Sequence, residues 1–281
     1  MPRATIPTFA LYGEDDWQSP AGFGHSETIA ARSALHDWAI APHRHDRAVQ
    51  ILLVHSGPAD VTLDGTQFAL TGPAFIVVPS GVVHAFRFTP DTHGHVLTLG
   101  QDFAHRARHG SDPLGALLTR GGHARLDPVM AARAGRLADE VTALGHSGKA
   151  GDALFDALAE ALVRSLIAST AAPAPADTGD RRLALFRHMV ETHLAEHRPL
   201  AFYARSTGTT VRTLTRLTQR HLGQSPQTLI NRRLALEAQR LLRYTGASAG
   251  AVATTLGFAD ASYFSRFYLR MTGHRPQDER S

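Results

Sequence analysis

The stretch ATTLGFADASYFSRFYLRMTGHRP, residues 253–276, repeats an earlier stretch, ARSTGTTVRTLTRLTQRHLGQSP, residues 204–226. The equivalent pairs are Ala204 and Ala253, Gly208 and Gly257, Leu214 and Phe264, Arg216 and Arg266, Gly223 and Gly273, and Pro226 and Pro276. The offset is 49 for the first two pairs and 50 for the others, so the second copy has one extra residue in its turn. An internal repeat of this kind indicates two copies of one supersecondary unit.

Each copy has the physical features of a helix-turn-helix. A small alanine lets two helices cross closely, and a glycine four residues later can end the first helix in the left-handed conformation. A polar residue that can cap the second helix follows, Thr209 or Thr210 in the first copy and Asp260 in the second. The apolar side chains expected to pack inward from the second helix of each copy are Val211, Leu214, Leu217, Phe264 and Phe267.

The opposite face of each second helix is polar and basic, as in a helix that enters the major groove of double-stranded DNA. Arginine can hold guanine through two hydrogen bonds, and Ser, Thr or Gln can read other base edges. A helix of roughly 17 residues over 227–244 would span about 26 Å and hold the two copies about one DNA turn apart. An ordinary helical hairpin with a solvated arginine face is the alternative. The positions expected to face DNA are Arg212, Thr213, Thr215, Arg216, Gln219, Ala261, Ser262, Tyr263 and Arg266.

The charge of the chain is divided unevenly at the proline-rich stretch AAPAPADTGD, residues 171–180. Residues 1–180 carry 13 basic and 19 acidic side chains, a net charge of −6, whereas residues 181–281 carry 16 and 6, a net charge of +10. Such a basic domain is the electrostatic footprint of a protein that binds the phosphate backbone. A basic surface that serves only solubility is the other interpretation.

Composition bounds the remaining choices. A chain of 281 residues is long enough for two domains with separate cores. The absence of cysteine excludes disulfides, thiolate zinc sites and a cysteine nucleophile, so any metal would need His, Asp, Glu or Gln. We find neither a run of about 18 apolar residues nor a signal-peptide pattern, and expect a cytoplasmic protein without a membrane span.

Short apolar segments separated by turns fill the first hundred residues. They cover residues 51–57, 59–65, 66–70, 74–81, 84–88 and 95–100, a spacing typical of an antiparallel barrel or sandwich. From 127 to 169 the pattern becomes helical, with two amphipathic helices broken at GHSGKAGD, residues 145–152. These helices could cover the barrel or form the contact of a homodimer, and we favour the dimer contact, with Ala and Leu side chains on the contact face.

The fold predicted from these patterns has two domains, an N-terminal all-β barrel with following helices and a C-terminal all-α tandem helix-turn-helix domain. The predicted segments are an effector-binding domain over 1–125, a helical dimerisation or coupling segment over 126–170, a linker over 171–180 and a DNA-binding domain over 181–281.

The stretch PHRHDRAVQ, residues 42–50, carries the candidate site of the barrel. His43 and His45 share a face in an extended chain, and Gln50 joins them only if a turn intervenes. With His84 they would form a cluster suited to zinc, nickel or iron. The same residues, with Trp38 and Phe86 as aromatic walls, could instead line a polar pocket for an organic effector, or the histidines could be merely structural. No cofactor is certain.

The second repeat, GFADASYFSRFYLRMTGHRP over residues 257–276, resembles the C-terminal signature of the AraC/XylS family of bacterial transcription regulators, and the first resembles that family's other helix-turn-helix. The resemblance covers residues 183–278 and implies that the polar positions named above face bases or backbone. Two residues depart from the pattern. Thr218 stands where the first unit usually has an aromatic core residue, and Tyr268 replaces the usual Phe.

Three N-terminal stretches carry a further resemblance: IPTFALYGE (6–14), HSETIAARSALHDWAIAPHRHDRAVQILLVHSG (25–57) and VVPSGVVHAFRF (77–88). Within them, His43, His45 and Gln50, then Pro79, Gly81 and His84, resemble the two cupin motifs, with Gln in place of the usual Glu. This resemblance implies that the N-terminal all-β barrel is cupin-like. Together the stretches look like the sensor domain of regulators of 4-hydroxybenzoate and 4-hydroxyphenylacetate catabolism. This resemblance implies a small aromatic acid as effector.

We therefore predict a DNA-binding transcription regulator that works with RNA polymerase, as an activator, on a catabolic operon, and that is not an enzyme. Two alternatives remain. A cupin metal-dependent enzyme such as a dioxygenase would explain the histidines but not the tandem repeat. A DNA-binding regulator whose cupin domain only dimerises, or senses metal, would explain both.

Overall fold

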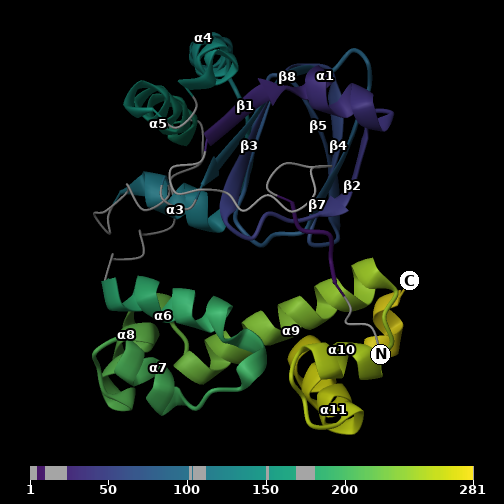
Figure 1. Cartoon of the computed structure of the whole chain (residues 1–281), viewed down its shortest axis with the longest axis vertical. Coiled ribbons are helices and arrows are strands. Elements are labelled where there is room, and N and C mark those ends of the chain that lie inside the picture. Colours follow the sequence, from purple (N-terminus) through teal and green to yellow (C-terminus); the bar gives the residue numbers. More distant parts are fainter. Residues whose placement is uncertain are drawn as a thin grey trace. The chain divides into compact units, whose positions relative to one another are not determined.

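A computed structural model describes residues 5–9, 24–100, 103, 112–149, 152–168 and 181–280. The chain divides into two compact units (Figure 1). The N-terminal domain contains residues 7–176, and the C-terminal domain contains residues 177–281 together with residues 1–6. The predicted linker, residues 171–180, and part of the stretch 6–14 lie outside the described residues. Among the described helices, none has the length and hydrophobicity needed to cross a bilayer.

Two antiparallel sheets form the N-terminal domain (Figure 1). One has the strand order β1-β8-β3-β6-β9 and the other β2-β7-β4-β5. Their bounds are β1 Gly24–Thr28, β2 Ala39–His43, β3 Ala48–Ser56, β4 Pro58–Leu63, β5 Thr66–Thr71, β6 Ala74–Val78, β7 His84–Phe88, β8 His93–Gly100 and β9 Gly122–Arg125. A short helix, α1 (Ile29–Ser33), and a 3₁₀ turn, η1 (Ala34–His36), lie between β1 and β2. The all-β class predicted from the alternating apolar segments is confirmed.

Strand β3 shows how the sequence builds two cores from one sheet. Successive side chains of a strand point to opposite faces. Leu52 and Val54 therefore join the cluster between the two sheets, whereas Ile51 and Leu53 join the cluster under the helices that follow the barrel. Gln50 shares the inner face with Leu52 and Val54, so its amide is carried into the apolar interior of the barrel.

The hairpin between β4 and β5 turns at Asp64 and Gly65, which have φ of 46° and 83°. Two consecutive residues with positive φ match the right-handed twist of the flanking strands, and Asp-Gly is a preferred pair for such a turn. This two-residue turn sets the pairing of β4 with β5, in which Leu63 lies opposite Thr66 and Val61 opposite Phe68.

Three helices cover the outer face of the five-stranded sheet: α3 (Pro113–Arg120), α4 (Pro128–Leu144) and α5 (Ala153–Ile167). A short π-helical turn, η2 (Gly145–Lys149), breaks α4 from α5 at the predicted position. The inner faces of α4 and α5 bury Ala134, Ala138, Leu162 and Leu166 in one cluster with the sheet. The Ala and Leu side chains predicted to contact a second subunit are thus used, in large part, to cover the barrel, while Val129 and Leu154 remain 70% and 59% exposed.

The C-terminal domain is entirely helical within its described residues. Its elements are α6 Arg181–Thr192, η3 Leu194–Glu196, α7 Leu200–Ser206, α8 Val211–Leu222, α9 Pro226–Thr245, α10 Ala249–Thr255, α11 Ala261–Thr272 and η4 Pro276–Arg280. Helices α7 and α8 form the first helix-turn-helix, and α10 and α11 form the second. The 20-residue α9 joins them, as predicted (Figure 1).

The turn chemistry of the two repeats follows the prediction. Gly208 and Gly257 have φ of +64° and +74°. Thr210 accepts a hydrogen bond from the Thr213 amide, and Asp260 accepts one from the Tyr263 amide, so each caps its second helix. The cap lies two residues after the glycine in the first unit and three after it in the second, which accounts for the extra residue.

One packing prediction was wrong: Val211 is 38% exposed, because the first residue of α8 lies outside the inward stripe formed by Leu214 and Thr218. Thr218 is fully buried, with its hydroxyl donating to the Thr215 carbonyl oxygen. This internal hydrogen bond makes a hydroxyl tolerable where the family usually has an aromatic side chain.

Candidate functional site

The outward face of α8 carries the predicted polar set of the first helix-turn-helix. Arg212, Arg216 and Gln219 are exposed, and with Thr215 and Arg220 they line one shallow concave surface. Arg216 makes no ion pair within the described residues, which favours the outward role over a pairing between helices. Thr215 donates its hydroxyl to the Val211 carbonyl oxygen, so toward a base it can offer only an acceptor. Thr213 is partly buried at the start of the helix.

Helix α11 presents the equivalent surface in the second unit. Ala261, Ser262, Tyr263 and Arg266 are all exposed, Tyr263 to 48%. The opposite face buries Phe264, Phe267 and Tyr268. The two recognition surfaces differ in chemistry: the first is rich in arginine, whereas the second opens with small side chains and a tyrosine.

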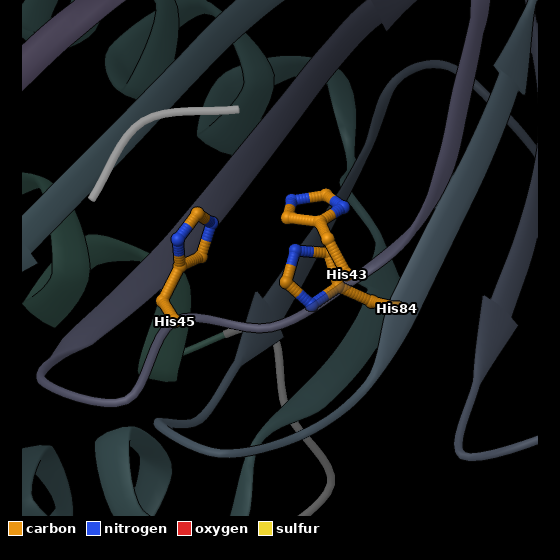
Figure 2. A group of neighbouring side chains, drawn as sticks. All are labelled: His43, His45 and His84. Atoms are coloured by element: carbon orange, nitrogen blue, oxygen red, sulfur yellow. The ribbon is translucent and has the colours of Figure 1, made fainter. Parts of the chain in front are cut away.

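The second candidate site is a buried histidine cluster in the barrel, formed by His43, His45 and His84. His43 ends β2 and lies directly opposite His84, the first residue of β7. His45 follows in the turn between β2 and β3, and this turn is the one that the spacing of Gln50 required. All three side chains are almost fully buried, with exposures of 1%, 2% and 1%. Figure 2 shows one nitrogen of each ring facing the gap between the rings.

Main-chain carbonyl groups fix the orientation of all three rings. The Nδ1 atoms of His43, His45 and His84 donate to the carbonyl oxygens of Ala41, Phe9 and Val82 at 2.9, 2.7 and 2.9 Å. A carbonyl oxygen can only accept, so each Nδ1 carries the proton. In a neutral ring the lone pair must then lie on Nε2.

The rings are neutral because burial disfavours the charged form. Burial, with a smaller contribution from His45, lowers the pKa of His43 to about 3. Burial also lowers the pKa of His45. Burial, with smaller contributions from His43 and His45, lowers the pKa of His84 well below its usual value. Three neutral imidazoles therefore line the interior at physiological pH.

Gln50 and two aromatic residues complete the surroundings. The Gln50 amide nitrogen lies 3.1 Å from Nε2 of His45 and donates to it. The ring of Phe86 lies 5.5 Å from that of His84, and Trp38 is packed against the same interior cluster. His43, His45, Gln50, His84 and Phe86 thus lie close to one another, and Trp38 packs against the apolar cluster that contains Phe86. Arg87, next to Phe86 on β7, is exposed.

The donor set fits a transition metal. One ligand atom from each histidine lies within 4.8 Å of the others. Two imidazole nitrogens on one ion are separated by at most about 4.2 Å, because zinc–nitrogen bonds are about 2.1 Å long, so small ring rotations close the difference. Nε2 of His84 is buried without a hydrogen-bond partner among the described residues, and a lone pair in that state is available to a ligand.

A second histidine group escaped the sequence analysis. Nε2 of His55 lies 2.9 Å from Nδ1 of His95, and Nε2 of His95 lies 3.3 Å from a carboxylate oxygen of Asp139. This chain of polar contacts joins β3 and β8 to α4. Its contacting members are at least 40 residues apart in sequence, so a local sequence motif could not have predicted this group.

Comparison with known families now gives the class of the protein. Residues 23–168 match the model of the AraC-like ligand binding domain, and residues 203–281 match that of a helix-turn-helix domain. The chain therefore belongs to the AraC family of DNA-binding transcription regulators, with a ligand-binding domain ahead of its helix-turn-helix domain.

Individual relatives resemble only parts of the chain in sequence. It is 32% identical over 104 residues to the HTH-type transcriptional activator RhaS of Enterobacter sp. (strain 638), and the match spans 37% of each protein. RhaS of Salmonella newport is 31% identical over 105 residues, 37% of this chain and 38% of the relative.

Among solved structures, apo ToxT of Vibrio cholerae is 14% identical with a TM-score of 0.43, covering 91% of this chain and 94% of ToxT. An AraC-type regulator from Chromobacterium violaceum is 25% identical with a TM-score of 0.34, covering 36% and 89% of the two chains.

Proposed function

We propose that this regulator binds a small hydroxylated aromatic acid in its barrel and, in response, activates a nearby catabolic operon. The observation that carries the proposal is the polar cluster of His43, His45, Gln50 and His84, buried beside the apolar cluster between the two sheets. A ligand-binding domain of the AraC family needs an effector, and a pocket with aromatic walls and a few convergent polar groups suits an aromatic ring with polar substituents.

Chemistry at the cluster favours a hydroxylated ring. A phenol hydroxyl can donate to a bare Nε2 atom, and Phe86 offers an aromatic face close to His84. The resemblance of residues 25–57 and 77–88 to sensors of 4-hydroxybenzoate and 4-hydroxyphenylacetate supports the same class of compound.

Signal transfer is proposed to run from the barrel to DNA through α4 and α5, which share a core with the sheet. An effector must favour one arrangement of the protein over another to change its DNA-bound population. We propose that the chain acts in the cytoplasm as a homodimer, with the exposed faces of α4 and α5, including Val129 and Leu154, at the contact. The two helix-turn-helix units would bind one face of a DNA duplex and recruit RNA polymerase. The name transcriptional activator carried by the RhaS relatives supports activation.

The test is a thermal-shift screen of hydroxylated aromatic acids, run with and without a chelator. Stabilisation by one of these acids is expected, because a ligand that binds only the folded state raises the melting temperature. Benzoate and cyclohexanecarboxylate serve as controls that lack the hydroxyl and the ring. A screen without any shift in either arm would overturn the proposal, and turnover of the compound would establish the competing cupin enzyme.

A further inference from the structure

The two helix-turn-helix units meet at a second place besides α9. Nε2 of His197, the residue that follows η3, donates a hydrogen bond to the Leu256 carbonyl oxygen at 2.8 Å. The rings of His197 and Phe258 lie 4.8 Å apart, edge to face, at an interplanar angle of 74°. Residues 195–197 lead into the first unit and residues 256–258 form the turn of the second. This contact, which we call the inter-unit bridge, therefore joins the two units directly.

The glycine in the middle of the second turn makes room for the inter-unit bridge. A Cβ at Gly257 would lie 2.0 Å from the Ala195 carbonyl oxygen and 3.2 Å from Cδ2 of His197. The equivalent glycine of the first unit, Gly208, has nothing within 4 Å of such a Cβ. Both glycines have the left-handed backbone of the turn, but only Gly257 also allows the main chain of the other unit to approach closely.

The first-unit end of the bridge is held on α7. The ring of His193 lies 4.8 Å from that of Phe202, and the Arg198 guanidinium lies 5.2 Å from the same ring. The Glu196 carboxylate accepts hydrogen bonds from His193 and Arg198 at 3.0 and 2.7 Å. These contacts close residues 193–198 into one turn against α7, so His197 moves with the first unit.

The second-unit end of the bridge lies against the recognition helix α11. The ring of Phe258 is 5.9, 5.2 and 5.1 Å from the rings of Tyr263, Phe264 and Phe267. Phe264 and Phe267 belong to the buried face of α11, whereas Tyr263 is 48% exposed on the face expected to meet DNA. Because Phe258 contacts both faces, the bridge acts on the orientation of α11 and of its DNA-facing side chains.

We propose that the inter-unit bridge fixes α11 relative to α8, and that His197 is a positioning residue that makes the regulator selective for the spacing of its two half-sites. Two recognition helices read one duplex only if their separation matches the groove. Helix α9 ends at Thr245 and α10 begins at Ala249, after a turn through a left-handed Gly246. A DNA with another spacing requires the units to shift about this turn, which breaks the bond from His197. The correct spacing leaves that bond intact in free and bound protein.

The experiment measures binding of the full chain to a duplex selected by the wild type, and to the same duplex with one base pair inserted between the half-sites. The insertion moves one half-site by about 3.4 Å along the duplex and about 35° around it. Wild type should bind the inserted duplex more than about 10-fold more weakly, because contacts of one unit are lost. His197→Ala should reduce this ratio by about 2–10-fold, the factor that one hydrogen bond contributes, and should bind the original duplex as the wild type does.

His197→Gln is the matched variant, since it too replaces histidine at a backbone with φ of 49° but keeps an N–H donor, and it should keep the wild-type ratio. His188→Ala should also keep it, because His188 is an exposed histidine on α6, whose inner face packs into the core of the first unit. Circular dichroism checks that all variants are folded.

Three results would overturn the proposal. The first is a wild type indifferent to the insertion, and the second is an equal ratio for wild type and His197→Ala. The third is a His197→Gln ratio equal to that of His197→Ala, which would remove the hydrogen bond as the cause. A loss of affinity by His197→Ala that is the same for both duplexes gives an unchanged ratio, so a merely structural role of His197 falls under the second result.

Discussion

Tyr268→Phe is predicted to loosen the second helix-turn-helix, although phenylalanine is the usual residue of the family at this position. The Tyr268 hydroxyl donates to Glu279, whose carboxylate also accepts from Arg243 and His274. Tyr268 is fully buried, and the Glu279 side chain is 2% exposed. The hydroxyl thus ties α11 to η4 through a buried charge, and its removal deprives that charge of one of three partners.

The expected loss is about 1.5–3 kcal/mol in free energy of unfolding, the usual range for a hydrogen bond to a charged group. Tyr263→Phe is the control on the same helix. Its side chain is 48% exposed, so the loss of the hydroxyl should change stability by less than about 0.5 kcal/mol.

Urea unfolding followed by far-UV circular dichroism measures this effect, since the C-terminal domain is helical. Trp38 belongs to the N-terminal domain, so its fluorescence reports that domain and should not change. A Tyr268→Phe midpoint equal to that of Tyr263→Phe would refute the role assigned to the hydroxyl.

The same network predicts a pH dependence. The hydrogen bond to Glu279 is the main cause that raises the pKa of His274. A histidine with a raised folded pKa contributes stability that is complete below its unfolded pKa of about 6.5 and is lost as the pH rises through the folded value. The helical transition should therefore weaken with rising pH above about 6.5, and His274→Gln should flatten that slope.

Five further substitutions, in three comparisons, test other parts of the structure. Gln50→Glu should destabilise the metal-free barrel, because it buries a carboxylate beside His45, and Zn²⁺ should restore the melting temperature; equal melting without metal would speak against it. Arg212→Ala and Arg266→Ala should each weaken binding to a duplex selected by the wild type by about 1–3 kcal/mol if the side chain contacts a base; unchanged footprints in both would remove them from the interface. Gly257→Ala should cost more stability than Gly208→Ala, because a Cβ at Gly257 would meet the Ala195 carbonyl oxygen at 2.0 Å, whereas Gly208 has nothing within 4 Å; equal losses in thermal unfolding would contradict this.

The strands that sequence patterns predicted are those with continuous apolar runs or a clear turn. Strands β3, β6 and β8 are buried on both faces, and the Asp64–Gly65 turn marks β4 and β5. The three missed strands, β1, β2 and β9, all lie at sheet edges. Edge strands are short and polar, as in GHSET of β1 and GHAR of β9, so they carry no periodic apolar signal.

The barrel cluster was predictable because motif spacing and strand alternation act locally. His43, His45 and Gln50 lie within eight residues, and His84 begins a recognisable strand. The Phe9 carbonyl that orients His45 lies 36 residues away in sequence, and a main-chain acceptor has no side-chain signature. The dimer contact stays a prediction, because an amphipathic pattern marks a buried face without stating which surface covers it.

Transcription from a reporter promoter tests most directly whether the buried histidine cluster controls DNA-dependent function. The assay uses 4-hydroxybenzoate as inducer and a selected operator upstream of the reporter. Wild-type protein is predicted to raise transcription by a factor of about 5–150, the factor that corresponds to typical coupling free energies between two sites. His84→Asn and Arg266→Ala should abolish the rise, and His93→Ala should retain it. Equal induction by wild type and His84→Asn would contradict the assignment of the cluster as the effector site.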